Sequence, residues 1–440
     1  MAEKVSGAAG RRSRGLARHR NFRRLWIADT ASQFGTQVSV LAMPLIAVLT
    51  LKVSPQAVGI LVAMEFAAFL LFGLPAGAWC DRWRRRPVMI IGDLARFLLL
   101  ASVPAAYWLD VLTIWQLYVV VLLQGVATTF FDVAYQSYLP SLVPAEALIE
   151  GNAKLQGSAA VAQVSGPALA GYLIQWLTAP IAVLADAASY LFSAVNVARI
   201  RHGEPVPEQP EHRSLRREIG EGLGVVFGNP ILRTLAAATA VANFFMAVFT
   251  AVIILFLART LGLPPGAIGA AMTLGSIGAV VGAVATSPLA RRFGPARSAW
   301  VPFAVGCPIG LLIPLAQRGA LLVLFVLGWF GFSFAFTAYN VAGVSLRQAL
   351  CPAHLLGRMN ATMRFLSVGV MPFGALIGGG LASWVGPRST LWVAMIGELL
   401  VPILLLRSPL RSMRGPAPAP AETVSQGESA PPFLEARASG

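Results

Sequence analysis

The sequence contains few charged residues for its length. Only 12% of its 440 residues are Asp, Glu, Lys or Arg, whereas 56% are hydrophobic. Soluble domains are typically about one quarter charged, so this composition excludes an ordinary soluble globular protein. We expect a membrane protein, because long apolar segments are stable in lipid rather than in water.

Cysteine and histidine are also scarce, and their positions exclude several kinds of site. Cys80, Cys307 and Cys351 are an odd number without metal-ligand spacing, so neither a disulfide framework nor a metal site is expected. The 4 histidines fall outside the apolar runs, and no nucleophile motif stands beside them. We therefore expect no enzyme activity, no cofactor and no bound metal.

The basic residues outnumber the acidic ones and give a net charge of +15. They occur in short clusters between apolar runs of about 20 residues, which is typical of membrane topology rather than of a nucleic-acid-binding face. No nucleic-acid partner is expected. The basic first residues are not followed by a short apolar segment with a small-residue cleavage site, so we expect the first span itself to direct insertion.

Twelve apolar stretches are long enough to cross a bilayer as helices, the form that pairs every backbone polar group in lipid. The fold class predicted is therefore an all-α membrane protein with twelve transmembrane helices. The expected spans are 25–50, 57–80, 87–108, 113–139, 155–177, 180–199, 234–258, 266–290, 299–317, 320–344, 360–385 and 390–406.

The orientation follows from the side on which Lys and Arg gather, since cytoplasmic flanks carry the excess. Alternate connections hold only Lys52, Arg259, Arg318 and Arg388, and the remaining 30 of the 34 basic residues lie on the other side. We expect a multi-pass protein of the inner (plasma) membrane with both termini cytoplasmic. The predicted units are a basic cytoplasmic arm (1–24), a six-helix bundle (25–199), a linker with an amphipathic helix (200–233), a second bundle (234–406) and a disordered cytoplasmic tail (407–440).

An internal repeat runs through the chain. Matching residues recur at offsets of 208 or 210, which stay constant across several expected helices. The pairs include Leu142 with Leu350, Pro144 with Pro352, Asn152 with Asn360, Pro55 with Pro265, and Gly59 with Gly269. Two six-helix bundles related by a pseudo-two-fold axis along the membrane normal are therefore predicted, with a substrate cleft between them near the bilayer midplane.

The connection between the second and third spans combines one carboxylate with several arginines. A cytoplasmic basic cluster explains the arginines but not Asp81, whose charge is unfavourable at the C-terminal end of a helix. The segment resembles the Gly-x-x-x-Asp-Arg-x-Gly-Arg-Arg signature of the major facilitator superfamily, except that Arg84 replaces the usual glycine. The matching residues are Gly77, Asp81, Arg82, Arg85 and Arg86.

That resemblance implies a conformational role for the segment. Asp81 is expected to dock near Asn360, at the start of the eleventh span, and to hold the two halves together on the cytoplasmic side. Asp93 and Arg96, just inside the third span, are expected to join the same charge network.

A second motif lies in the fifth span and resembles the antiporter signature of exporters in this superfamily. It consists of Ala162, Gly166, Pro167, Ala170 and Gly171, with alanine at two usual glycine positions. The small residues stand one turn apart and permit close helix approach, and the proline bends the helix. Ordinary small-residue packing is the alternative interpretation.

Residues 20–410 as a whole resemble the macrolide-efflux and siderophore-exporter branch of the superfamily, including the run from Phe130 to Pro140. The resemblance implies a secondary active exporter of amphipathic small molecules (drug, antibiotic or siderophore-like) that works by alternating access and is driven by proton influx. Its partners would be the small-molecule substrate, protons and the lipid bilayer, and a monomer is expected to suffice. The alternative is a facilitator or symporter that imports a small nutrient.

Five acidic residues within the spans are candidates for proton coupling: Glu65, Asp132, Asp29, Asp186 and Glu398. A charge at a helix centre costs about 2.5–3.5 kcal/mol, so such residues are expected to face a cavity or a partner. Asp29 and Asp132 are expected less than two turns from the cytoplasmic ends of their helices, whereas Glu65 is expected deeper. For Asp186 and Glu398, a structural role in a permanent pair is an interpretation at least as well supported as proton coupling. Phe34, Phe244 and Trp329 are candidates for an aromatic lining of the substrate cavity.

Overall fold

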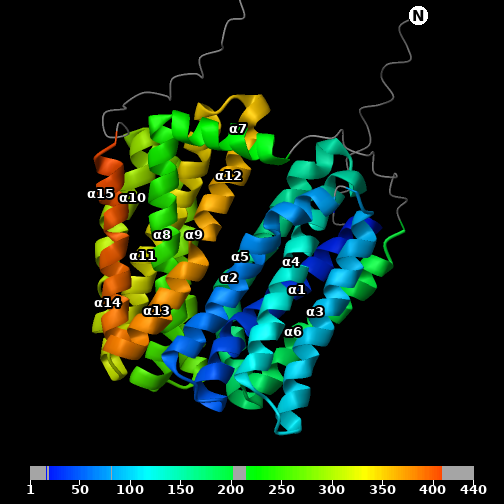
Figure 1. The fold of residues 1–440 in the computed structure, drawn as a ribbon, viewed down its shortest axis with the longest axis vertical. Coiled ribbons are helices and arrows are strands. Elements are labelled where there is room, and N and C mark those ends of the chain that lie inside the picture. Colours follow the sequence, from blue (N-terminus) through cyan, green and yellow to red (C-terminus); the bar gives the residue numbers. More distant parts are fainter. Residues whose placement is uncertain (1–15, 17–18, 81, 202–214, 409–440) are drawn as a thin grey trace, which may run out of the picture.

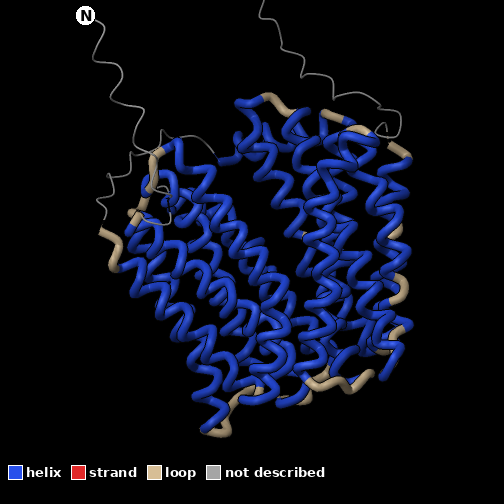
Figure 2. Tube along the Cα trace, turned by 180° about the vertical axis from the view of Figure 1, so that it is seen from behind, coloured by secondary structure: helices blue, strands red, loops and turns tan. Residues whose placement is uncertain are grey.

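The computed structural model describes residues 16, 19–80, 82–201 and 215–408, and these residues form helices and short connections without any strand (Figures 1 and 2). The first six long helices, here called the N-half, form one bundle. Their bounds are α1 (Arg20–Leu45), continued by the π-helical turn η2 (Ile46–Thr50), then α2 (Pro55–Cys80), α3 (Arg85–Trp108), α4 (Ile114–Leu142), α5 (Leu148–Leu177) and α6 (Ala179–Ala198).

A second bundle, here called the C-half, follows the short helix α7 (Leu215–Gly228). Two of its six spans are interrupted, each close to a proline that cannot donate a backbone hydrogen bond. The bounds are α8 (Pro230–Leu255), continued by the π-helical turn η4 (Phe256–Thr260), α9 (Pro265–Phe293), α10 (Pro295–Gly310), α11 (Leu322–Leu350), α12 (Leu356–Gly369) with α13 (Met371–Val385), and α14 (Pro387–Glu398) with α15 (Leu400–Leu406).

The predicted duplication is confirmed by where the helices begin. The first three helices of the C-half begin 210 residues after their N-half counterparts and the next three begin 208 residues after them, as in Arg20 with Pro230 and Leu148 with Leu356. The turns repeat as well: Lys52 and Gly262, 210 apart, both have positive φ. Thr178 and Gly386, 208 apart, also both have positive φ, which glycine adopts without strain and threonine does not. The backbone geometry of the ancestral unit is therefore retained in both halves.

Eleven of the twelve long helices are apolar enough along a whole stretch of 18 residues to cross a membrane. The exception is α5, which has 30 residues but carries Glu150, Asn152 and Lys154 in its first turns. These polar residues explain why the prediction placed the start of this span at 155, whereas the helix begins at Leu148. The predicted spans 360–385 and 390–406 were expected to be continuous, and the structure corrects this with breaks near Pro372 and Pro402.

Other helix ends also differ from the prediction. The helix α1 begins at Arg20, within the arm expected to end at residue 24, and α11 continues to Leu350 rather than ending at 344. Both extensions are at the end of the molecule that carries α7. Helices can continue past the apolar stretch there because their outer turns lie beyond the hydrocarbon core and need not be apolar. The apolar pattern alone therefore underestimates their length.

The two halves meet at one end of the molecule, which we call the closed end, and diverge toward the end that carries α7 (Figure 1). Figure 2 shows the same convergence from behind. Four hydrogen bonds join the halves toward the closed end: Gln56 N to Ser383 Oγ at 2.9 Å, Ala168 N to Thr273 Oγ1 at 2.9 Å, Gly266 N to Gln175 Oε1 at 3.0 Å, and Arg259 Nη2 to Val48 O at 2.9 Å.

Glycines allow the backbones to touch at the closed end. A Cβ atom added to Gly59 on α2 would lie 2.6 Å from the Cα of Gly379 on α13, and one added to Gly171 on α5 would lie 3.0 Å from the Cα of Gly269 on α9. At the α7 end of α5, by contrast, a Cβ at Gly157 would meet no atom within 4 Å. The same helix is thus tightly packed against the other half at one end and free of it at the other.

This contrast leads to a prediction about the closed end. Gly171→Ala is expected to push α5 and α9 apart, at a cost of about 1–3 kcal/mol typical of overpacking, and so to populate an arrangement in which this end is open. The measurement is the rate of maleimide labelling of a cysteine placed at Thr273, in a chain whose native cysteines are replaced. Gly157→Ala is the matched control and should leave the rate unchanged. Equal rates in the two variants would show that the glycine contact does not hold this end closed.

The helix α7 lies across the end of the C-half and contacts α12 (Figure 1). Arg358 on α12 forms an ion pair with Glu221 on α7, and a Cβ at Gly222 would lie 2.9 Å from the carbonyl oxygen of Arg358. Val226 is fully buried among C-half residues. The helix is therefore attached to the C-half.

Candidate functional site

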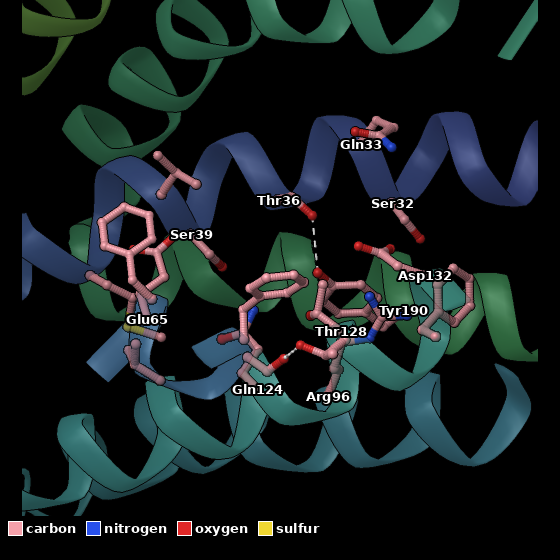
Figure 3. Close-up of a pocket in the computed structure, with 18 of the residues that line it drawn as sticks. Ser32, Gln33, Thr36, Ser39, Glu65, Arg96, Gln124, Thr128, Asp132 and Tyr190 are labelled. Carbon is pink, nitrogen blue, oxygen red and sulfur yellow. Dashed lines mark hydrogen bonds between the residues drawn. The ribbon is translucent and has the colours of Figure 1, made fainter. Parts of the chain in front are cut away.

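The N-half contains a cavity of about 430 Å³, and all the residues that line it belong to this half. Its wall is made by α1, α2, α3, α4 and α6. Figure 3 shows many of the residues that line it. The polar and aromatic members are Asp29, Ser32, Gln33, Thr36, Ser39, Glu65, Phe66, Phe69, Arg96, Gln124, Thr128, Thr129, Phe131, Asp132, Tyr135 and Tyr190.

Arg96 is held rigidly in the wall of this cavity. Its guanidinium lies 4.2 Å from the ring centres of both Phe131 on α4 and Tyr190 on α6, an arrangement that favours a cation. On its own helix it forms an ion pair with Asp93 at 2.5 Å, and both side chains are almost fully buried. The Tyr190 hydroxyl lies 3.0 Å from Thr36 Oγ1 on α1 (Figure 3). These contacts fix three helices around one charge.

Three of the five predicted acids line the cavity. Asp29 is 8% exposed and lies beside Gln33 and Tyr135. Asp132 is half-buried and lies within electrostatic range of Arg96. Glu65 is exposed to the cavity, and its carboxylate has no hydrogen bond or ion pair with any residue that the structure describes.

The three acids are not equivalent in position. Figure 3 shows Glu65 toward one end of the cavity, near Ser39, and Asp132 toward the other, near Ser32. The expectation that Asp29 and Asp132 lie less than two turns from their helix ends is wrong. Asp29 stands nine residues after Arg20 and Asp132 ten residues before Leu142, about 13 Å and 15 Å along their helices, because both helices are longer than predicted.

Asp186 and Glu398 are both fully buried and line neither of the cavities described here. Asp186 accepts a hydrogen bond from Ser39 on α1, and a second from Ser189 at 3.3 Å, which gives it the paired environment of a structural residue. Glu398 differs: neither of its carboxyl oxygens has a hydrogen-bond partner in the described part of the chain. It is the last residue of α14, where the helix breaks before Pro402.

The unpartnered carboxyl of Glu398 predicts a gain in stability on its removal. A buried polar group without a partner costs about 1–3 kcal/mol, so Glu398→Met should raise the midpoint of thermal unfolding of the purified protein. Thr390→Val is the matched control on the same helix, since the Thr390 hydroxyl is equally buried but donates to the carbonyl oxygen of Gly386 at 2.9 Å. This control should not be stabilised. A lower midpoint for Glu398→Met would show that the carboxyl has a partner.

The C-half has a smaller cavity of about 230 Å³, near the α7 end of its bundle. It is formed by α8, α11 and α12, and its lining is almost entirely polar: Thr239, Asn243, Asn340, Arg347, Asn360, Met363, Arg364 and Ser367. This group is not among the sites predicted from the sequence. The internal repeat could have identified part of this lining. Offsets of 210 and 208 relate Asp29 to Thr239, Gln33 to Asn243 and Asp132 to Asn340.

The predicted aromatic lining lies elsewhere. Phe34 lines neither cavity, Phe244 stacks edge to face on Phe245 with ring centres 5.2 Å apart, and Trp329 stacks on Phe249 at 5.0 Å within the C-half. The aromatic wall of the N-half cavity is instead formed by residues that sequence analysis did not select as cavity residues: Phe66, Phe69, Phe131, Tyr135 and Tyr190. Apolar helices carry aromatic residues on all faces, so the pattern does not indicate which face lines a cavity.

The signature residues around the connection from α2 to α3 differ in their surroundings. Asp81 lies outside the described residues, Arg82 is exposed, and Arg85 is half-buried. Arg86 donates to the carbonyl oxygens of Val197, at 3.2 Å, and Ala198 at the end of α6, where a positive charge is favourable. A Cβ at Gly77 would meet no atom within 4 Å. Asp93 and Arg96, expected to join the same network, form an ion pair with each other, and Arg96 lines the N-half cavity.

The small residues of α5 contact two different helices. Ala162, Gly166, Ala170 and Gly171 are buried, with Gly166 packed against Gln37 on α1. Gly171 packs against Gly269 on α9, and a Cβ at Gly269 would approach the carbonyl group of Pro167. The motif therefore forms part of the contact between the halves at the closed end.

Comparison with known sequences and structures gives consistent matches. The sequence model of the Major Facilitator Superfamily matches residues 25–253 and 235–438. An uncharacterized MFS-type transporter, YfiS of Bacillus subtilis (strain 168), is 25% identical over 87% of this chain and 91% of its own. The multidrug efflux pump Tap of Mycolicibacterium fortuitum is 26% identical over 77% of this chain and 84% of its own.

Among solved structures, a bacterial homologue of the iron transporter ferroportin is similar in fold at 17% identity. In its inward-facing state the TM-score is 0.72, over 88% of this chain and 98% of that one. In its outward-facing state the TM-score is 0.58, over 90% and 100%. The fold is thus similar to both states, with the higher TM-score against the inward-facing one.

Proposed function

Because the chain belongs to the Major Facilitator Superfamily, we propose that it is a secondary active exporter of amphipathic small molecules driven by proton influx. The observation that carries this proposal is the N-half cavity, which is lined by Asp29, Glu65 and Asp132 and whose Phe69 is contacted by Arg364 of the C-half. Desolvation favours the neutral form of a carboxyl, so such groups can take up protons on one side of a membrane and release them on the other.

In the proposed cycle, the two halves are apart first at one end of the molecule and then at the other. Basic residues gather at the α7 end, which the distribution of Lys and Arg assigns to the cytoplasm. In this orientation the structure is open to the cytoplasm and sealed on the outside by the glycine contacts and hydrogen bonds of the closed end. Rocking of one half against the other would break those contacts and expose the acids to the outside. Both half-cavities belong to one chain, which supports a monomer as the transporting unit.

Proton influx supplies enough energy for this cycle. One elementary charge that crosses 100 mV gains about 2.3 kcal/mol, which shifts a two-state equilibrium by roughly fiftyfold. The direction of export is supported by the similarity to the multidrug efflux pump Tap and by the small-residue motif of α5. The mixed aromatic and acidic lining of the N-half cavity favours an amphipathic substrate that carries a positive charge.

The experiment uses everted membrane vesicles, in which the cytoplasmic side faces outward, and rhodamine 123 as a cationic amphipathic probe. Acidification of the vesicle interior should drive dye accumulation, and collapse of the pH gradient by a protonophore should release the dye. An importer driven by protons would instead show no accumulation in everted vesicles and uptake into right-side-out vesicles. That outcome would replace export by nutrient import.

A further inference from the structure

The two half-cavities share three positions of the repeat but differ in charge. Residues at offsets of 210 and 208 place Thr239 where the N-half has Asp29, and Asn340 where it has Asp132. The C-half cavity therefore contains no acid. Its charged residues are two arginines, Arg347 and Arg364, at the positions of Leu139 and Gln156 in the N-half. The N-half cavity thus carries three acids and one arginine, Arg96, which is paired with Asp93, whereas the C-half cavity carries two arginines.

The two arginines are available to a ligand. Neither has a carboxylate partner among the residues that the structure describes, in contrast to Arg96, whose charge is compensated by Asp93. Arg347 donates through Nε to the carbonyl oxygen of Gly343 on its own helix at 3.2 Å. That bond leaves its two terminal nitrogens as donors. Guanidinium groups bind carboxylate and phosphate oxygens through paired hydrogen bonds.

Arg364 extends from the C-half toward the N-half. Its guanidinium lies 4.4 Å from the ring centre of Phe69, which lines the N-half cavity, and its charge acts on the carboxylate of Asp132. Its side chain is exposed, beside Phe69 of the N-half. Arg364 of the C-half cavity thus contacts the lining of the N-half cavity, which places the basic and acidic groups within reach of a single ligand.

From this arrangement we propose that the substrate carries an oxyanion group, a carboxylate or phosphate, that binds Arg347 and Arg364, and a cationic or amphipathic end that lies against the acids of the N-half. The class is a dipolar amphipathic molecule rather than a simple lipophilic cation. Asn243, Asn340 and Asn360 line the same cavity as the two arginines. Their side-chain amides can form hydrogen bonds with other polar groups of the substrate that lie near the oxyanion. This inference rests on the proposed function, since it specifies the substrate class of the same site.

The test compares two dyes that differ only in one group. Rhodamine 110 carries a free carboxylate, and rhodamine 123 is its methyl ester. The affinity of each is measured by fluorescence anisotropy on the purified full-length protein in phosphatidylcholine nanodiscs. The wild type should bind the carboxylate dye about tenfold more tightly, the contribution of a hydrogen-bonded charge pair. Arg347→Gln and Arg364→Gln should remove the preference and leave the affinity for the ester almost unchanged.

Two further variants keep the test decisive. Arg364→Lys preserves a charge and should retain part of the preference, whereas Arg291→Gln changes an exposed arginine at the end of α9, outside both cavities, and should behave as wild type. Equal or tighter binding of the ester by the wild type would overturn the inference, as would an equal loss of both dyes in the arginine variants. Transport of rhodamine 123 in vesicles is independent of this comparison, so failure of the proposed export is recognised separately.

The phosphate of a lipid headgroup could also bind the two arginines. A second measurement distinguishes such a lipid from a soluble substrate. The anisotropy measurement is repeated in nanodiscs that contain phosphatidylglycerol. An unchanged preference supports a soluble substrate. Loss of the preference in the wild type, with no lipid effect in Arg364→Gln, would assign the site to the lipid phosphate and overturn the assignment to a transported substrate.

Discussion

Glu65→Gln and Asp132→Asn are each expected to abolish dye accumulation driven by a pH gradient, while energy-independent exchange of dye across the membrane continues. The reason is that glutamine and asparagine keep the size and polarity of these cavity residues but cannot gain or lose a proton. A carrier that cannot exchange protons still alternates between its two open states when substrate is bound. Coupling should therefore be lost without loss of binding.

The measurement uses proteoliposomes loaded with unlabelled rhodamine 123. Gradient-driven uptake and counterflow exchange of the labelled dye are recorded for the same preparation. Asp110→Asn is the matched control, because Asp110 is exposed in the connection after α3 and has φ of 56°, a conformation that asparagine tolerates well. It should keep both activities. If gradient-driven uptake survives in both cavity variants, these two acids are not the coupling groups.

Asp93→Ala is expected to cause the largest loss of stability among single substitutions in the N-half. The change leaves the guanidinium of Arg96 buried without its counter-ion, and breaking a buried pair from one side costs about 3–5 kcal/mol. The aromatic rings of Phe131 and Tyr190 compensate only part of that charge. Because α3, α4 and α6 meet at this residue, the whole N-half should be affected.

The midpoint of thermal unfolding of the purified protein measures this effect. Lys154→Met is the control, since Lys154 and Glu150 form a half-exposed pair at 3.6 Å that should contribute at most about 1 kcal/mol. The double variant Asp93→Leu with Arg96→Met should recover much of the loss, because it removes both buried charges together. If Asp93→Ala unfolds at the same midpoint as the control, the pair does not hold the N-half together.

Much of the fold could be predicted because lipid imposes a simple rule on the chain. Each apolar run long enough to cross the bilayer becomes a helix, and matches such as Asn152 with Asn360 at one offset require the second half to repeat the first. The polar start of α5 and the breaks near Pro372 and Pro402 could not be placed in this way, because they depend on local backbone chemistry rather than on hydropathy.

The candidate site was less predictable than the fold. Acids are rare within apolar spans, so Asp29, Glu65 and Asp132 could be selected by type alone. Hydropathy does not distinguish a residue that faces a cavity from one that faces a neighbouring helix, which is why Asp186 and Glu398 were selected with them. Asparagine and threonine are common in all helices, so Asn243 and Thr239 become notable only when the repeat is superposed on the acids of the N-half.

The π-helical turns at Ile46–Thr50 and Phe256–Thr260 occupy the same place in both halves, 210 residues apart. A shared irregularity of this kind predates the gene duplication, so the ancestral six-helix protein already carried it. Such a turn packs less regularly than an α-helix and is found frequently at functional sites. Both turns lie toward the closed end, where Arg259 of the second turn donates a hydrogen bond to the carbonyl oxygen of Val48 in the first, so the inherited irregularity now forms part of the contact between the halves.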